Sequence, residues 1–137
     1  IIPTIVGLLM KRAGCIAVDR NAGMSALKKM KREAALIKKT GRSILIFPQG
    51  TRVVPTDSTT PYQVGTFSLY QALSLPVVPV ALDSGYYWPK KTFLKNAGII
   101  EVIFLKPIKT GLPKEKFMST LVNSIEESCD KLKKEEN

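Results

Sequence analysis

The sequence predicts an α/β domain in which a mixed, largely parallel sheet is flanked by helices. Short apolar runs that suit buried strands alternate with segments whose apolar residues recur every three or four positions. The run Ser43–Phe47, "SILIF", is apolar almost throughout, as are strands buried on both faces of a parallel sheet. At 137 residues, 45% of them hydrophobic, residues 1–137 are expected to form a single domain with its own core.

The first part of the chain is predicted to supply two helices and two strands. Thr4–Ala13 forms a helix that follows Pro3, and Cys15–Val18 is a short buried strand. A longer helix runs from about Met24 to Lys39, and Ser43–Phe47 follows it as the second strand. The longer helix is predicted from an apolar stripe at helical spacing: Leu27, Met30, Ala34 and Ile37.

The second part is predicted to add two helices and two more strands. Val64–Leu73 and Pro113–Lys134 are the helices. Pro76–Leu82 is a strand whose prolines place it near a sheet edge or a bulge, and Gly98–Ile108 is another strand. Residues 48–61 show no periodicity and are expected to form a loop.

The chain begins at Ile1, inside the apolar run "IIPTIVGLLM". Ten residues are too few to cross a bilayer, which takes about 20. No basic stretch precedes the run, so it does not resemble a signal peptide. We therefore expect the C-terminal portion of a longer protein, with the N-terminal part of the domain missing.

The charge balance restricts the class of partner. With 21 Lys and Arg against 11 Asp and Glu, the formal net charge is +10, which favours nucleic acid, anionic lipid or phosphorylated metabolites. The absence of histidine excludes an imidazole base and a histidine metal ligand within these residues. The two cysteines are far apart in sequence, which suggests free thiols in a reducing compartment.

Two arginines each follow a predicted strand. Arg20 ends "AVDR" and Arg52 ends "FPQGTR". In open α/β sheets the ligand crevice lies at the carboxyl ends of the strands, and the planar guanidinium suits phosphate oxygens. Gly50 permits a close backbone approach, and Thr51 adds a hydroxyl. These residues predict a phosphate site, although a structural turn with incidental arginines explains them equally well.

The order of three blocks resembles the glycerolipid acyltransferases, in particular the bacterial 1-acyl-sn-glycerol-3-phosphate acyltransferases. "GCIAVDR" (Gly14–Arg20) matches the second block of that family, and "FPQGTR" matches its third, usually written FPEGTR. "LPVVPVAL" (Leu75–Leu82) matches the fourth. The resemblance extends from about Pro3 to Pro107. Its specificity comes from the combination, because each block alone is a weak signal.

The resemblance implies acyl transfer from acyl-CoA or acyl carrier protein to lysophosphatidic acid, which gives phosphatidic acid without a metal or a further cofactor. In the family a His-x4-Asp motif supplies the base; it is absent here and expected upstream of Ile1, so this chain alone should not turn over. The family's second and third blocks hold the acceptor phosphate. That role carries over to five residues: Arg20, Gln49, Gly50, Thr51 and Arg52.

Gln49 stands where the family usually has glutamate. Glutamine keeps a carbonyl acceptor but loses the charge and adds two donors. If the family's glutamate only accepts hydrogen bonds, Gln49 can replace it. If the glutamate forms an ion pair that aims an arginine, the affinity for the phosphate should suffer.

The resemblance also implies a membrane-associated enzyme on the cytoplasmic face, in bacteria the inner membrane. The basic face of the helix Met24–Lys39 could dock on anionic lipid or could be an ordinary solvated face. "GYYWPKKTFLK" (Gly85–Lys95) could be an interfacial segment or a loop that covers the core. A related acyltransferase with another acceptor remains an alternative. A second alternative is a non-catalytic, basic module that binds nucleic acid. RRM, KH and zinc-finger signatures are absent, so we expect no nucleic-acid partner.

Overall fold

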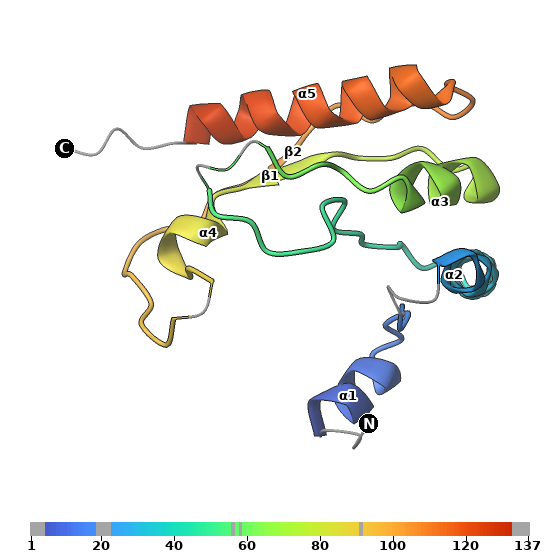
Figure 1. Cartoon of the computed structure of the whole chain (residues 1–137), viewed down its shortest axis with the longest axis horizontal. Coiled ribbons are helices and arrows are strands. Elements are labelled where there is room, and N and C mark those ends of the chain that lie inside the picture. Colours follow the sequence, from blue (N-terminus) through green and yellow to red (C-terminus); the bar gives the residue numbers. More distant parts are fainter. Residues whose placement is uncertain (1–4, 19–22, 56, 58, 91, 133–137) are drawn as a thin grey trace. The chain divides into compact units, whose positions relative to one another are not determined.

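The computed structural model describes residues 5–18, 23–55, 57, 59–90 and 92–132. These residues belong to two compact units, Ile1–Leu45 and Ile46–Asn137, and each unit is described by itself. Helices and strands both occur, as an α/β chain requires (Figure 1).

The first unit contains two helices, α1 (Ile5–Arg12) and α2 (Gly23–Lys39). Both helices were predicted from the sequence. Helix α1 is one residue shorter at each end than predicted, and α2 begins one residue earlier than predicted. On α2, Ala34 is fully buried and the lysines of the last turn are exposed. The apolar stripe at helical spacing therefore predicted α2 correctly.

Two expected strands are not observed among the described residues. Cys15–Val18 and Ser43–Phe47 form no strand pairing. Leu45 and Phe47 are 78% and 68% exposed, so the apolar run "SILIF" is not buried in this structure. A strand requires a neighbour for its N–H and C=O groups, and no neighbouring strand pairs with these segments.

The second unit contains three helices and two strands. The helices are α3 (Gly65–Leu73), α4 (Ser84–Tyr87) and α5 (Lys114–Leu132). The strands are β1 (Val80–Leu82) and β2 (Val102–Phe104). In Figure 1, α5 lies along the two strands, and α3 lies near one end of α5. Helices α3 and α5 were predicted, whereas the single turn α4 was not.

The sheet is a two-stranded antiparallel ladder, and the largely parallel sheet is not observed in the described residues. Val80 pairs with Phe104, Ala81 with Ile103 and Leu82 with Val102. An isolated bridge joins Val77 to Ile108 further along the same two segments. The predicted strands Pro76–Leu82 and Gly98–Ile108 are thus correct in place but too long. Prolines at 76 and 79 remove two backbone donors, which limits the ladder.

The core of the second unit is centred on Phe117 of α5. Its side chain is fully buried, and the ring of Tyr70 stacks on it with centroids 4.0 Å apart. Ile108 and Leu121 complete the buried cluster. This cluster joins α3, α5 and the segment that follows β2.

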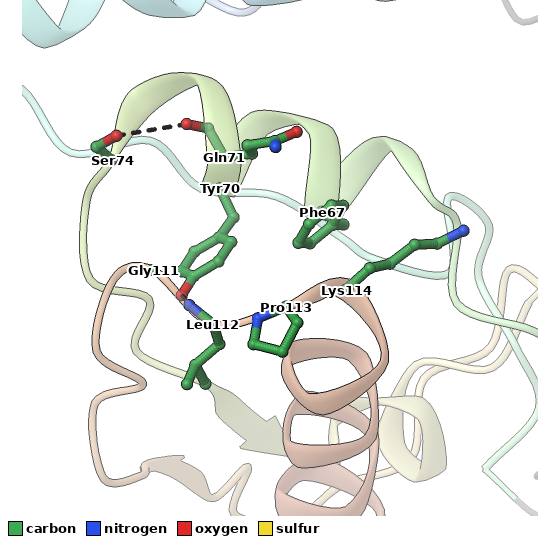
Figure 2. Close-up of a pocket in the computed structure, with 8 residues that line it drawn as sticks. All are labelled: Phe67, Tyr70, Gln71, Ser74, Gly111, Leu112, Pro113 and Lys114. Carbon is green, nitrogen blue, oxygen red and sulfur yellow. Dashed lines mark hydrogen bonds between the residues drawn. The ribbon is translucent and has the colours of Figure 1, made fainter.

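The hydroxyl of Tyr70 is satisfied by two backbone groups. It donates to the Lys109 carbonyl at 2.7 Å and accepts from the Leu112 N–H at 2.8 Å. Figure 2 shows Tyr70 reaching from α3 toward Leu112, in the turn that precedes α5. The hydroxyl therefore fixes α3 against this turn.

Replacement of Tyr70 by phenylalanine should lower the free energy of unfolding by about 1–3 kcal/mol, because it leaves one backbone donor and one acceptor without a partner. Urea denaturation of the variant and the parent chain measures the difference. Tyr86→Phe is the matched control: it removes a hydroxyl for which the described residues provide no hydrogen bond. Equal losses in the two variants would contradict the assignment.

Candidate phosphate-binding site

The block "FPQGTR" forms a tight turn at residues 47–50. The Gly50 N–H donates to the Phe47 carbonyl at 2.9 Å, and the Gln63 N–H donates to the Pro48 carbonyl at 2.8 Å. The φ angle of Gly50 is +67°, a left-handed conformation that glycine adopts without strain. A Cβ at this position would lie 3.5 Å from Cγ of Gln63, an ordinary contact, so it is the dihedral angle that favours glycine.

Arg52 leaves this turn and is held by Trp88. Its Nη2 donates to the Trp88 carbonyl, and its guanidinium carbon lies 5.6 Å from the centroid of the indole ring. A guanidinium has five N–H donors, so a single carbonyl leaves most of them available to a ligand. Arg52 is exposed to solvent. The contact with Trp88 therefore orients the guanidinium without covering it.

Two lysines complete a cationic cluster, which we define as Arg52, Lys90 and Lys95. Lys90 Nζ donates to the Thr51 hydroxyl at 3.3 Å. Lys95 Nζ lies 4.6 Å from the centroid of the Trp88 ring, within cation–π range. No carboxylate of the described residues forms an ion pair with these three cations. The cluster therefore presents a positive potential that favours an anion.

A small cavity of about 110 Å³ lies beside the cluster. Arg52 and Lys90 supply its cationic lining, and Trp88 also lines it. Its remaining lining is mostly apolar: Val53, Val54, Pro55, Gly85 and Pro89. A phosphate could approach the cations here while the apolar lining accommodates the carbon atoms attached to it.

Four of the five residues that the sequence predicts for this site are consecutive in the chain, and of these four Arg52 alone lines the cavity. Gln49, Gly50, Thr51 and Arg52 lie on one turn and its exit. Arg20 lies outside the described residues, so its position relative to this turn is not assigned.

Three residues of the site were not predicted: Trp88, Lys90 and Lys95. The available signal was the mixture of aromatic residues and lysines in "GYYWPKKTFLK", which was interpreted as interfacial or core-covering. Tyr86 and Tyr87 are half-buried, whereas Trp88 is about half exposed and contacts Arg52. The segment thus has one part that is half-buried and one part that lies at the cationic cluster.

A larger cavity, of about 520 Å³, contains none of the predicted site residues. It lies between α3 and the turn before α5 (Figure 2). The residues around it include the core rings Phe67 and Tyr70 together with Leu112 and Pro113. We therefore associate this cavity with the packing of α3 on α5.

The described ranges contain neither a metal-binding cluster nor a helix that could span a membrane. No three His, Cys, Asp or Glu side chains in those ranges gather closely enough to hold a metal ion. None of the helices in the same ranges combines the length and the apolar character needed to cross a membrane.

Comparison with known proteins gives the class of this chain. Residues 2–83 match the model of the Acyltransferase family, which is more than half of the chain. The chain belongs to this family. The match includes the turn at "FPQGTR" and extends through β1.

Within this family, the chain is similar to curated enzymes that share one name. The chain is 38% identical over 88 residues to the 1-acyl-sn-glycerol-3-phosphate acyltransferase of Pseudomonas aeruginosa, which covers 64% of this chain and 34% of the relative. It is 32% identical over 114 residues to the Saccharomyces cerevisiae enzyme of the same name, with coverages of 81% and 38%. The chain thus spans little more than a third of the length of these relatives. No solved structure matches it significantly.

The loop that follows the site is closed by Asp57. Its Oδ1 accepts hydrogen bonds from the N–H and the hydroxyl of Thr59, at 2.8 and 2.6 Å, and its Oδ2 accepts one from the Thr60 hydroxyl at 2.8 Å. The Thr59 hydroxyl, the Thr59 N–H and the Thr60 hydroxyl together lower the pKa of Asp57 from 3.8 to about 2. Hydrogen bonds to the charged form are the cause.

Because the pKa of Asp57 is lowered in the folded chain, its contribution to the stability of this loop is complete above pH 3.8 and is lost as the pH falls through about 2. The ¹³C chemical shift of the Asp57 carboxyl should therefore titrate near 2. Combined Thr59→Val and Thr60→Val substitutions should return it toward 3.8. The control is Thr120→Val, which removes a hydroxyl bonded to the Lys116 carbonyl on α5 and should leave the titration unchanged.

Proposed function

We propose that the complete protein transfers a fatty acyl group from a thioester to the free hydroxyl of 1-acyl-sn-glycerol-3-phosphate, forming phosphatidic acid. The observation that carries this proposal is the cationic cluster around "FPQGTR", assembled in a chain that belongs to an acyltransferase family. The relatives from Pseudomonas aeruginosa, Saccharomyces cerevisiae and mouse that are named 1-acyl-sn-glycerol-3-phosphate acyltransferases support the choice of acceptor.

In this proposal each residue of the turn has a separate role in binding the acceptor phosphate. Arg52 supplies bidentate donors, and the Thr51 hydroxyl and Lys90 supply a further hydrogen bond and charge. The Gly50 N–H is already bonded to Phe47, so glycine acts through the shape of the turn. Arg20, in the second block, is proposed as an additional phosphate ligand on the basis of the resemblance.

The chemistry requires a base that this chain does not contain. The acceptor hydroxyl attacks the thioester carbon; the new ester C–O bond forms, the C–S bond breaks, and the hydroxyl proton passes through the base to the departing thiol. We assign the base to a His-x4-Asp motif upstream of Ile1. The acyl donor is acyl-CoA or acyl carrier protein, and no metal or other cofactor takes part. The chain alone would therefore bind the acceptor without turnover.

We also propose that the two units form one domain in the complete protein, with Cys15–Val18 and Ser43–Phe47 paired in a largely parallel sheet. The exposed Leu45 and Phe47 support this, because apolar residues in an unpaired segment are stabilised by burial against neighbouring strands. The family match, which includes residues of both units, supports it as well.

The complete protein, including the segment upstream of Ile1, tests the function. It should convert lysophosphatidic acid to phosphatidic acid, detected by mass spectrometry, with acyl-CoA or acyl carrier protein as donor. Glycerol 3-phosphate and lysophosphatidylcholine serve as competing acceptors. A clear preference for either would overturn the proposed acceptor, and the absence of any acyl transfer would overturn the proposed activity.

Arg52→Ala should weaken the binding of glycerol 3-phosphate to this chain by about ten- to a hundredfold, because charged hydrogen bonds to the phosphate are lost. Isothermal titration calorimetry gives the dissociation constant. Arg32→Ala removes the same charge from an exposed position of α2, in the first unit, and should have little effect. An unchanged constant for Arg52→Ala would remove Arg52 from the site.

Gln49→Glu should change the same dissociation constant by less than about fivefold, the range of an exposed ion pair. The reason is that Trp88 already holds the Arg52 guanidinium, so a carboxylate at position 49 is not needed to aim it. Gln49→Ala is the companion variant that removes the side chain altogether. A much tighter complex with Gln49→Glu would instead support an aiming role for the carboxylate.

A further inference from the structure

The loop after α4 carries an exposed apolar tip. Phe93 is exposed over its whole side chain, and Leu94 is 81% exposed. We call residues 88–90 and 92–95 the docking loop and Phe93 with Leu94 its apolar tip. In Figure 1 the segment after α4 extends away from α5. An apolar pair of consecutive residues, both almost fully exposed, differs from single scattered surface leucines.

The base of the docking loop is tightly built. The Asn96 N–H donates to the Tyr87 carbonyl at 2.8 Å, and its side-chain amide donates to the Tyr86 carbonyl at 2.9 Å. Gly98 packs so closely on Tyr87 that a Cβ would lie 2.0 Å from the ring. These contacts close the loop at its base, so the exposure of its tip follows from ordered contacts.

The tip is ordered by its own local bonds. The Leu94 N–H donates to the Thr92 hydroxyl at 2.9 Å, and that hydroxyl donates to the Leu94 carbonyl at 3.2 Å. The N–H and the carbonyl of Leu94 therefore both have a hydrogen-bond partner within the docking loop. A segment with satisfied backbone groups can enter an apolar region at lower cost than one without.

Cationic residues flank the tip in the sequence. Lys90 and Lys95 of the docking loop are exposed, and Lys95 stacks on the half-exposed ring of Trp88. A tryptophan, lysines and an apolar pair on one short loop are the combination that interfacial membrane segments use. The positive charge of the cluster and the net charge of +10 complement an anionic bilayer surface.

We propose that the docking loop attaches the protein to anionic membranes by inserting Phe93 and Leu94 among the lipid headgroups. The same loop contacts the candidate site, through Trp88 to Arg52 and through Lys90 to Thr51. Insertion would therefore bring the cationic cluster to the depth of the lipid phosphates. This last step rests on the proposed function, whereas insertion itself does not.

Trp88 makes the proposal directly measurable, because it is the single tryptophan of the chain. Vesicles of phosphatidylcholine containing phosphatidylglycerol, without lysophosphatidic acid, should shift its emission to shorter wavelength. Vesicles of phosphatidylcholine alone should bind more weakly, and added salt should weaken binding to the anionic vesicles. Equal binding to both kinds of vesicle would overturn the role of the lysines.

The decisive variant is Phe93→Ser with Leu94→Ser, measured by sedimentation with the anionic vesicles. Its partition coefficient should fall by about tenfold or more, since two apolar side chains lose their burial. The matched control is Met24→Ser with Leu36→Ser, two exposed apolar residues of α2. The control should retain its partition within about twofold. An equal loss in the control overturns the proposal in favour of α2.

The double variant also distinguishes a membrane from other binding partners of the apolar tip. Unchanged vesicle partition together with a loss of self-association would assign the tip to a second copy of the chain. Unchanged partition together with a lower melting temperature of the complete protein would assign it to another part of that protein. Both outcomes overturn the proposal. Glycerol 3-phosphate has no acyl chain, so its binding to the double variant reports the phosphate site separately from membrane attachment.

Discussion

The hydroxyl of Tyr70 is the contact on which the second unit depends most. Because it both donates to Lys109 and accepts from Leu112, it fixes α3 against the turn that leads into α5. The ring of the same residue stacks on Phe117 at the centre of the core. From α3 the chain passes through residues 74–79 into β1, and Asp83 alone separates β1 from α4.

The candidate site joins two segments that are distant in sequence. One is a turn whose shape depends on the positive φ of Gly50, and the other is the C-terminal end of α4. Neither segment is sufficient alone: the turn supplies Arg52, and α4 supplies the carbonyl and ring that orient it. A cation oriented in advance loses less freedom when it binds an anion, so such a pairing suits a recognition site better than a solvated arginine.

Sequence patterns predicted the helices well and the sheet poorly. The apolar stripe that ends near Ile37 and the spacing along α5 are local properties, so a short window of sequence is sufficient to predict them. The pairing of Ser43–Phe47 depends on a partner strand, which no local pattern specifies. At the site, the residues of "FPQGTR" were predicted because they form a contiguous block. Trp88 was not assigned to the site, because its hydrogen bond to Arg52 comes from a backbone carbonyl and its ring contact joins segments that are distant in sequence.

The way in which Arg52 is anchored has an evolutionary consequence. Every amino acid carries a main-chain carbonyl, so the hydrogen bond from Arg52 survives any replacement at position 88 that keeps the backbone path. Selection on the side chain at that position therefore acts on the contact between the ring and the guanidinium, and not on the hydrogen bond. The residue can diverge under other pressures, such as contact with different surroundings, while the anchoring bond is inherited through the conformation of the chain.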